Sequence, residues 1–551
     1  MATVETDRDF VRLVEAGGMR PEMAARLKPY QKGAVLWFHK RYTSGISGAF
    51  LAFDMGLGKT PTSIAIACLL RSSLLSDRRT SGHPIVVVAP ASTVHDTWVD
   101  HFEMWTTLSC AEIKVADMDR HGLPESDVYI LTHDALGQLF KRSCGHERDT
   151  EMIQVKGVWT EKKVWRKKFE CEILDLAKSA VIYDEAHELR NPHSLRNRGG
   201  QEMLSPFNVM SSGTPLNNSP MDICAVCRVA GIITDPSIWK KMKRRINKTF
   251  VVDFRQRYIY RLTEDCLDPP LPQCVREKVS YHLASPEEVE AYNIMLAEAE
   301  NAAKAVRRRE RDDDAIMILL AAIGKLKRCM FHPALADTSM SREERIVRMF
   351  ENGSSKMLAA ANGINRLLFS LGHKKIIVVS DETTQLVALR EFYRRNHGAA
   401  NGAKSLLYDG TLDRTKRQQV LNTFRNVDEA RILYLSLKAG GTGLNLTEAT
   451  GMLFVGLWYN REAHNQAYKR IHRIGQTSVT NVLTLCCTPE VPISPTFEES
   501  VLDLHQDKSR AFESIVNGDF AWADGAAKPD KPEWKVQMNL LKNLKPLVRR
   551  G

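Results

Sequence analysis

The sequence predicts an α/β fold in which two parallel-sheet lobes are separated by a helical insertion. Apolar, β-branched runs alternate with longer helical patterns in two separate stretches of the chain, which is typical of parallel sheets covered by helices. The 551 residues also exceed what one hydrophobic core normally serves. We therefore expect two large lobes, each with its own sheet.

Each predicted strand ends just before a polar or glycine-containing turn. In the first half of the chain the predicted strands are Ala49–Phe53, Pro84–Ala89, Val128–Thr132, Ala180–Tyr183 and Asn208–Ser211. In the second half they are Lys375–Ser380, Ser405–Tyr408, Arg431–Ser436 and Met452–Val455. Ligands of such sheets bind beyond the carboxyl ends of the strands. The functional residues are therefore expected in the turns that follow.

The stretch between the two predicted sheets reads mainly as helix, including the basic-then-acidic run Arg307–Asp314. After Pro495 a charged helical pattern continues through Lys508, followed by a polar tail. The predicted organisation is an N-terminal extension (1–26), a first lobe (27–220), a helical protrusion and linker (221–355), a second lobe (356–500) and a C-terminal brace or tail (501–551).

The composition indicates a soluble globular protein with a basic surface. The 77 Lys and Arg residues outnumber the 66 Asp and Glu residues, which gives a formal net charge of +11. That excess favours a polyanionic partner, although a solvated basic surface explains the charge equally well. Charge alone therefore does not decide between the two.

Membrane insertion, secretion and a zinc site are all disfavoured by the sequence. The apolar stretch Ala315–Ile323 is far short of the roughly 20 residues that a spanning helix needs. The N-terminus lacks a signal-peptide pattern, so we expect an intracellular protein. Cys224 and Cys227 form a CxxC without a nearby second ligand pair, which favours core cysteines on a helix over zinc.

The first predicted strand leads into a phosphate-binding loop. Its residues are Asp54, Met55, Gly56, Leu57, Gly58, Lys59 and Thr60, with Pro61 opening a helix. Glycines let backbone N–H groups approach phosphates, Lys59 reaches the β and γ phosphates, and Thr60 can ligate Mg²⁺. Phe53 replaces the usual first glycine of this motif, so a chance glycine turn is the alternative. The motif predicts a site for ATP and Mg²⁺.

A second strand end carries a pair of adjacent acids, Asp184 and Glu185, followed by Ala186 and His187. Asp184 is placed to hold Mg²⁺, and Glu185 to orient and deprotonate the attacking water. An acidic helix cap would explain an isolated pair. After a phosphate-binding loop, at the end of another strand, the pair instead predicts hydrolysis of ATP.

Taken in order, these motifs resemble the Swi/Snf-like family of superfamily-two double-stranded-DNA translocases. The segments that carry the resemblance are Leu27–Gln31, Asp54–Thr60, Asp184–His187 with Asn191, Ser212–Asn218, Arg328–Pro333, Ala439–Leu446 and Gln466–Gln476. The similarity runs from about Leu27 to Gln476. It implies two RecA-like lobes, with ATP bound in the cleft between them.

The resemblance also implies roles for further residues at the nucleotide. Gln31 would read the adenine edge, whereas without the family a solvent-exposed turn residue is the better reading. Gly443 and Gln466 would join the nucleotide-binding set. The residues that would couple ATP state to lobe movement are His187, Ser212, Gly213 and Thr214, although an ordinary SGTP turn would also explain the last three.

Arg470 and Arg473 are predicted to act as arginine fingers. Their spacing of three places them on one face of a helix. From there both would stabilise charge on the γ-phosphate when the lobes close. A solvated basic helix face is the ordinary interpretation of such residues, and the family motif favours the catalytic one.

The nucleic-acid contacts are expected in loops at strand ends of both lobes. By resemblance these residues are Ser92, Thr93, Thr132 and His133 in the first lobe and Ser380, Ser436 and Lys438 in the second. Two basic segments leave the interpretation open. Trp159–Phe169 is either a hairpin that touches nucleic acid or one that only packs its Trp residues. Lys240–Lys248 is a phosphate contact, a nuclear localisation signal or a solvated helix face.

The predicted function is ATP-dependent translocation on double-stranded DNA, in chromatin remodelling or DNA repair. The partners would be duplex DNA, with nucleosomes or other DNA-bound proteins, and in a eukaryote the protein would be nuclear. The segment Gly456–Arg461 departs from the family's Asp-x-x-Trp-Asn-Pro, which affects fine nucleotide geometry. A strand-separating superfamily-two helicase on RNA or DNA and an ATP-switched DNA-binding scaffold are the alternatives.

Overall fold

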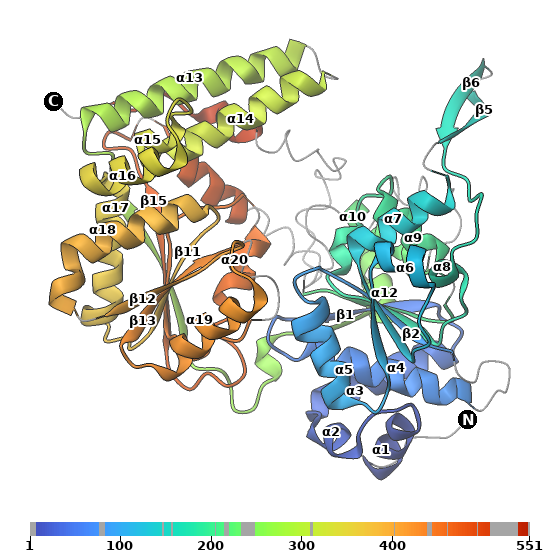
Figure 1. Cartoon of the computed structure of the whole chain (residues 1–551). Coiled ribbons are helices and arrows are strands. Elements are labelled where there is room, and N and C mark those ends of the chain that lie inside the picture. Colours follow the sequence, from blue (N-terminus) through green and yellow to red (C-terminus); the bar gives the residue numbers. More distant parts are fainter. Residues whose placement is uncertain are drawn as a thin grey trace. The chain divides into compact units, whose positions relative to one another are not determined.

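A computed structural model describes most of the chain. The described residues are 7–75, 83–145, 148–155, 158–203, 205–213, 220–232, 248–308, 312–401, 403–437, 444–459, 461–492, 494–506 and 538–548. The described residues up to Asp268 form one compact unit, and those from Pro269 onward form a second (Figure 1).

The first unit is built on a seven-stranded parallel sheet of order β3-β4-β2-β7-β8-β1-β9. Its strands are β1 (Gly48–Phe53), β2 (Ile85–Ala89), β3 (Cys110–Ile113), β4 (Val128–Thr132), β7 (Ala180–Tyr183), β8 (Asn208–Ser211) and β9 (Ile259–Leu262). The side chains of β2 alternate between two apolar clusters: Ile85 and Val87 join one, while Val86 and Val88 join the other. The strand is buried on both faces, which is why its sequence is continuously apolar.

Helices cover both faces of this sheet. They are α1 (Asp7–Ala16), α2 (Pro21–Arg26), α3 (Pro29–Thr43), α4 (Lys59–Leu75), α5 (Asp100–Trp105), α6 (Val115–His121), α7 (His133–Ser143), α8 (Glu172–Asp175), α9 (Leu195–Glu202), α10 (Pro220–Val229) and α12 (Lys248–Tyr258). Core residues of α1, α3 and α4 belong to one cluster, and those of α7 and α10 belong to the other.

An antiparallel hairpin, β5 (Asp149–Val155) and β6 (Val158–Val164), projects from the first unit (Figure 1). The sequence predicted a hairpin within Trp159–Phe169. The structure places most of that segment in the second strand and in the chain that follows it, so the hairpin begins earlier than expected.

The second unit has a six-stranded parallel sheet of order β10-β15-β14-β11-β13-β12. Its strands are β10 (Cys274–Tyr281), β11 (Ile376–Ser380), β12 (Lys404–Tyr408), β13 (Ala430–Ser436), β14 (Gly451–Phe454) and β15 (Thr480–Cys487). Its helices include α13 (Pro286–Arg308), α14 (Asp313–Cys329), α15 (Pro333–Ala336), α16 (Arg342–Asn352), α17 (Ser355–Asn365), α18 (Thr383–Asn401), α19 (Arg414–Asn426) and α20 (Arg461–Tyr468).

The α/β fold with two parallel-sheet lobes is confirmed. All nine strands named from the sequence occur, with ends within one residue of those expected. The structure adds β3 and β15 to the predicted sheets. It also places β9 and β10 in the stretch that was expected to be mainly helical, so one strand of that stretch completes each sheet.

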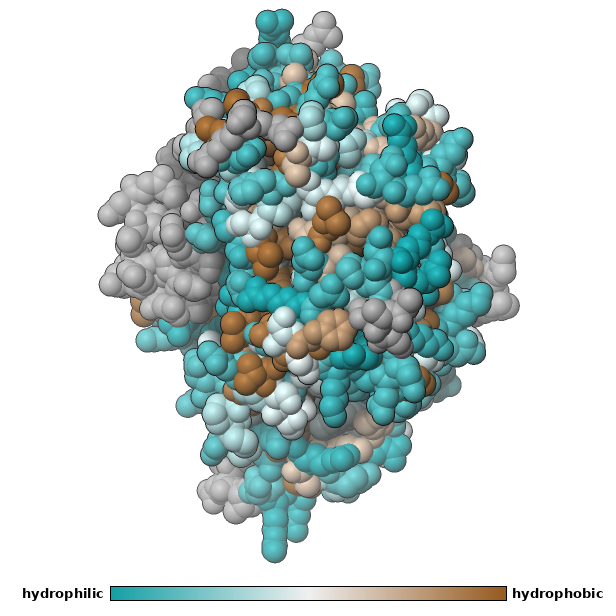
Figure 2. Space-filling model, turned by 90° about the vertical axis from the view of Figure 1, so that its left-hand side faces the viewer, coloured by the Kyte–Doolittle hydropathy of each residue, from teal (hydrophilic) through white to brown (hydrophobic). Residues whose placement is uncertain are grey.

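The predicted helical insertion contains the two long helices α13 and α14 (Figure 1). The apolar stretch that begins at Ala315 lies on α14, where Leu319 and Ile323 are buried but Met317 and Ile318 are exposed. In the described residues, no helix is long and apolar enough to cross a membrane. The face shown in Figure 2 is mainly hydrophilic, with scattered hydrophobic patches.

Candidate functional site

The turn between β1 and α4 has the backbone of a phosphate-binding loop. Gly56 and Gly58 have φ angles of 91° and 78°, a left-handed region that glycine adopts without steric cost. A Cβ atom at Gly58 would also lie 2.6 Å from the side-chain nitrogen of Gln31. Both glycines are therefore required by the turn itself, which opens onto the N-terminus of α4.

Lys59 lies at the start of α4 and turns its amine back over the loop. Its Nζ donates to the carbonyl oxygen of Phe53 across 3.3 Å. A Cβ atom at Gly213, which follows β8, would lie 3.3 Å from the same Nζ and 3.4 Å from Met55. Gly213 thus lies directly against the phosphate-binding loop. The neighbouring loop residue Leu57 is buried, whereas Thr60 is half-buried.

Phe53, the departure from the usual motif, is a core residue. Its ring packs against Tyr30 and Tyr260, at centroid distances of 6.1 and 6.2 Å, and it has no exposed surface. The next residue, Asp54, forms an ion pair with Arg261 on β9 and accepts from the backbone N–H of Glu264. The loop is therefore held by β9, a strand that the sequence did not reveal.

Gln31 lies on α3 and is only 5% exposed, so the interpretation as a solvent-exposed turn residue is wrong. Its amide donates to the carbonyl of Gly58 and to the hydroxyl of Thr62, over 3.2 and 3.1 Å. Its oxygen accepts from the backbone N–H of Lys28 across 2.8 Å. Gln31 braces the phosphate-binding loop, and one acceptor lone pair on its oxygen is left over.

Asp184 lies directly after β7, and its carboxylate is held from two directions. Oδ2 accepts from the indole N–H of Trp98 over 3.0 Å, and Oδ1 accepts from the backbone N–H of Glu185 over 3.0 Å. Its backbone carbonyl is bonded to Nε2 of His133 at 2.8 Å. Trp98 lies on η1 (Val94–Val99), a π-helical turn after β2. It is a site residue that the sequence reasoning missed.

Glu185 is the one non-glycine residue with a positive φ, 46°, in the part of the chain that the structure describes. Such a conformation costs energy and is found mostly at functional sites. Its carboxylate lies 3.2 Å from Nδ1 of His187, and the same Nδ1 lies 3.2 Å from the hydroxyl of Ser212. The structure thus links the end of β7 to the end of β8 through His187.

The pKa values of Asp184, Glu185 and His187 are all shifted from their usual values. Burial, reinforced by the neighbouring charge of Glu185, raises the pKa of Asp184. Burial also opposes ionisation of Glu185, but the hydrogen bond and charge of His187, with Lys59 nearby, bring its pKa below the usual value. The pKa of His187 is raised because Glu185 outweighs the effect of burial. Perturbed pKa values of buried groups cluster at functional sites.

The predicted nucleic-acid residues of the first unit have mixed exposure. Ser92 is exposed, but Thr93 is 2% exposed and donates its hydroxyl to the carbonyl of Pro90. The hydroxyl of Thr132 caps α7 by accepting from the N–H of Ala135. His133 is buried against Asp184, and burial lowers its pKa to about 4. Its ring faces the nucleotide-site residues, not solvent.

In the second unit, the ends of β11 and β13 meet. The N–H of Leu437, which follows Ser436, donates to the carbonyl of Ser380 over 2.9 Å. The hydroxyl of Ser380 is buried and bonded to the side-chain oxygen of Gln385. Ser436 is also buried. Three predicted site residues, Thr214, Lys438 and Gly443, lie outside the described residues, as do residues 240–247 of the basic segment.

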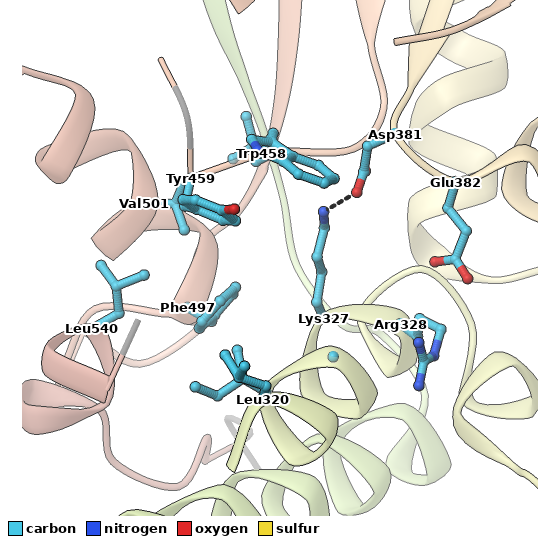
Figure 3. Close-up of a pocket in the computed structure, with 13 residues that line it drawn as sticks. Leu320, Lys327, Arg328, Asp381, Glu382, Trp458, Tyr459, Phe497, Val501 and Leu540 are labelled. Carbon is cyan, nitrogen blue, oxygen red and sulfur yellow. Dashed lines mark hydrogen bonds and ion pairs between the residues drawn. The ribbon is translucent and has the colours of Figure 1, made fainter. Parts of the chain in front are cut away.

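A cavity of about 270 Å³ lies beside the end of β11 in the second unit. Figure 3 shows Lys327 of α14 directed at Asp381, with Trp458 above the pair and Phe497 and Leu540 on the opposite wall. Lys327 and Asp381 form an ion pair, and the amine lies 5.1 Å from the centroid of the Trp458 ring. The strand-end loop at Ser380 is therefore tied to the helical insertion.

Arg470 and Arg473 do not share a helix, so that prediction was wrong. Helix α20 ends at Tyr468, and residues 469–475 form successive turns. The side-chain amide of Gln476 donates to three backbone carbonyls, of Thr447, Ala449 and Ile471. These bonds fix the turns in place of a continued helix. Burial lowers the pKa of Arg470 to about 10, and Gln466 is half-buried on α20.

Cys224 and Cys227 are buried on α10, as expected of core cysteines. In the described residues, no group of three or more His, Cys, Asp or Glu side chains is arranged to hold a metal ion.

Comparison with known proteins identifies the domains that contain these sites. Residues 30–335 match the SNF2-related domain, and residues 361–475 match the helicase conserved C-terminal domain. Mouse Chromodomain-helicase-DNA-binding protein 1-like is 26% identical over 92% of this chain and 51% of that protein. Arabidopsis thaliana Protein CHROMATIN REMODELING 19 is 24% identical over 94% of this chain and 72% of that protein.

A solved structure titled Sulfolobus solfataricus SWI2/SNF2 ATPase core in complex with dsDNA aligns with 90% of this chain and 94% of that chain, at 21% identity and a TM-score of 0.38. The chain spans about half the length of the mouse relative. Since the SNF2-related domain alone covers more than half of the sequence, the chain belongs to the SNF2-related family of helicase-like ATPases.

Proposed function

We propose that this chain is an ATP-dependent double-stranded-DNA translocase that remodels or displaces DNA-bound proteins. The observation that carries the proposal is the convergence of three strand ends in the first unit. The turns after β1, β7 and β8 bring together Lys59, Glu185 and Gly213. This is the place where an α/β sheet binds its ligand.

In this proposal each side chain has a distinct task. Lys59 leaves its weak bond to the Phe53 carbonyl and neutralises the β and γ phosphates. Glu185 accepts a proton from the attacking water, for which its lowered pKa keeps it ionised. His187 senses this change, because it is bonded to both Glu185 and Ser212. Ser212 then transmits it along β8.

The residues present fit a magnesium ion. Asp184 keeps one acceptor lone pair on each oxygen after its bonds to Trp98 and Glu185. Thr60 adds a half-buried hydroxyl at the start of α4. Hard oxygen donors of this kind suit Mg²⁺. When bound, the ion would neutralise charge on the β and γ phosphates during transfer.

Arg470 and Arg473 would complete the site from the second unit. Both guanidinium groups have pKa values lowered by burial in the second unit, and a buried guanidinium interacts strongly with an anion that reaches it. Gln466 lies on the preceding helix. Their placement in turns pinned by Gln476 favours a fixed presentation of both groups.

Duplex DNA is the proposed track, and the relatives support it. Two of them are named as a helicase-DNA-binding protein and a chromatin-remodelling protein. The net charge of +11 is consistent with a polyanionic partner. Ser92, the exposed member of the predicted contact loops, offers a hydroxyl that contacts phosphate without sequence preference. Chromatin remodelling in the nucleus is the role we favour by analogy with these relatives.

The test is steady-state ATP hydrolysis by the purified chain with no nucleic acid, double-stranded DNA, single-stranded DNA, RNA or nucleosomes. We expect duplex DNA or nucleosomes to stimulate most. Lys59→Ala and Glu185→Gln should abolish hydrolysis. Lys114→Ala and Glu112→Gln are the matched controls, because both residues are exposed in the same unit.

The pattern of stimulation separates the roles. Extra stimulation by nucleosomes over naked duplex supports remodelling, whereas equal stimulation supports repair or protein displacement. Stimulation by RNA alone would overturn the proposed substrate. A chain that binds DNA but hydrolyses no ATP would instead be an ATP-switched scaffold.

A further inference from the structure

The β5–β6 hairpin has one fully exposed face. In its register Thr150 pairs with Lys163, Met152 with Glu161, and Gln154 with Trp159. Side chains alternate between the two faces of a strand, so these six residues share one face, and all six are exposed. Trp159 is 63% exposed and Met152 is 52% exposed. A large aromatic residue displayed this openly contributes little to folding.

The root of the hairpin is anchored by a different tryptophan. The ring of Trp165 lies 6.3 Å from that of Phe140 on α7, and the guanidinium of Arg148 lies 5.6 Å from the Trp165 centroid. The N–H groups of Lys168 and Phe169 donate to the carbonyl of Ser143. The sequence left two alternatives for this segment, contact with nucleic acid or simple packing of its Trp residues. Trp165 packs against the first unit, whereas Trp159 does not.

The charge of the hairpin is also uneven. Residues 148–169 contain seven basic and three acidic side chains. Asp149 pairs with Lys168 at 2.8 Å, and Glu151 pairs with Arg166 at 3.4 Å. Lys162 and Lys163 have no acid within ion-pair distance in the described residues, and Glu161 is the one acid on the Trp159 face. Lys163 therefore shares the exposed Trp159 face, nearer the hairpin root than the ring, whereas Lys162 is opposite Glu151 on the other face.

We propose that this hairpin face is a nucleic-acid contact that recognises DNA with exposed bases, such as a gap, a fork or a single-stranded end. Lys163 contacts a phosphate, and Trp159 stacks on an unpaired base. Aromatic rings stack on any base whose face is open, but a continuous duplex hides these faces between neighbouring pairs. The excess of basic over acidic side chains in residues 148–169 favours a polyanion such as DNA over a protein partner.

The position of the hairpin in the first unit supports this assignment. Helix α7 begins beside Thr132, a predicted backbone contact, and ends at Ser143, to which the hairpin root is bonded. Its 11 residues span about 16 Å at about 1.5 Å per residue. A DNA strand rises about 3.4 Å per nucleotide, so the root lies a few nucleotides from the predicted contact. The inference rests on the proposed DNA-translocase function.

The experiment measures the affinity of the full chain for three labelled DNAs by fluorescence anisotropy: a duplex with both ends closed by loops, the same duplex with a five-nucleotide gap, and a fork. The wild type is compared with Trp159→Ala, Trp159→Phe and Lys163→Gln, with Lys162→Gln on the opposite face as the matched control. Melting temperature checks that each variant is folded.

We expect the wild type to prefer gapped and forked DNA over the closed duplex. Trp159→Ala should raise Kd for the gapped DNA at least about fivefold, the lower end of what a base stack contributes, and leave the closed duplex unchanged. Trp159→Phe should retain the preference. Lys163→Gln should weaken all three DNAs and reduce the salt slope by about 1, since each phosphate contact contributes about 0.9, whereas Lys162→Gln should leave the slope unchanged.

The outcomes separate this inference from the proposed function. If duplex DNA stimulates ATP hydrolysis but Trp159→Ala binds all three DNAs like the wild type, the hairpin inference is overturned and the translocase proposal stands. If no DNA stimulates hydrolysis by the wild type, the proposed function itself fails.

Discussion

Trp98 donates its indole N–H to the carboxylate of Asp184 over 3.0 Å, across 86 residues of sequence. Both side chains are buried, so the bond fixes the orientation of the carboxylate that we propose as a magnesium ligand. Each oxygen of the Asp184 carboxylate keeps one acceptor lone pair that its bonds to Trp98 and Glu185 do not use. A ligand residue held in this way has less freedom to lose when the ion binds.

Trp98→Phe should therefore weaken the use of MgATP without unfolding the protein. A hydrogen bond to a charged group contributes about 1.5–3 kcal/mol, which corresponds to roughly a ten- to hundredfold loss in kcat/KM. The half-maximal Mg²⁺ concentration should rise as well. Trp105→Phe, on the following helix, is the matched control. An unchanged Mg²⁺ dependence in Trp98→Phe would mean that the bond has no part in metal binding.

Gln31 offers a test of nucleotide recognition. Its oxygen keeps one lone pair that could accept from the adenine amine, while its amide is already bonded to Gly58 and Thr62. Gln31→Ala should lower the ratio of kcat/KM for ATP over GTP by about tenfold, since a site that hydrogen-bonds its ligand discriminates by this contact. Equal losses for both nucleotides would show that Gln31 only braces the loop.

Much of the first unit was predictable because its central strands are buried on both faces. Runs such as Ile85–Ala89 are apolar without interruption, and each strand leads into a motif with its own chemistry. The predicted residues Lys59, Asp184, Glu185, His187 and Ser212 are all brought to neighbouring strand ends. Local patterns were sufficient here, because the residues that carry the chemistry lie next to the strands that place them.

Other features depend on contacts that no local pattern encodes. β10 is an edge strand with mostly exposed side chains, so its sequence lacks an apolar run. Arg261, which holds Asp54, lies on the edge strand β9. The arginines after α20 have helical spacing, but the carbonyl of Ile471 accepts from the side chain of Gln476 and that of Arg470 accepts from the N–H of Leu446. In each case a distant partner overrides the local preference.

The ion pair between Lys327 and Asp381 predicts a dependence of the second unit on charge balance. The side chains of these residues are 21% and 8% exposed. Lys327→Met would leave a buried carboxylate without its partner, which should destabilise the second unit by about 3–5 kcal/mol. Adding Asp381→Asn should restore most of this loss, because it removes the unpaired charge.

Calorimetric melting of the full chain would follow the transition of the second unit in Lys327→Met, in Asp381→Asn and in the double variant. Lys325→Met, two residues before Lys327 on the same helix and in a more exposed ion pair, is the control and should change the melting temperature little. Additive losses from Lys327→Met and Asp381→Asn would show that the two side chains do not act as a pair.

His464 predicts the response of the second unit to acid. Its Nε2 accepts from the backbone N–H of Trp458 over 2.9 Å, and its ring packs 4.6 Å from Phe454. Burial, with the nearby charges of His505 and Lys327, lowers its pKa from 6.5 to about 3. Between about pH 6.5 and pH 3 the unfolded chain binds a proton at His464 that the folded chain does not bind. The folded protein therefore loses stability as the pH falls through this range.

The comparison of wild type with His464→Gln isolates this effect from the other acid-sensitive groups. Glutamine keeps an acceptor for the Trp458 N–H but does not titrate. At pH 7 the variant should be less stable than the wild type, because the ring packing on Phe454 is lost. The gap should narrow steadily as the pH is lowered from 6.5 toward 3, measured by thermal melting at each pH. Parallel curves would mean that His464 takes up its proton equally in the folded and unfolded chains, and that the Trp458 bond does not require a neutral ring.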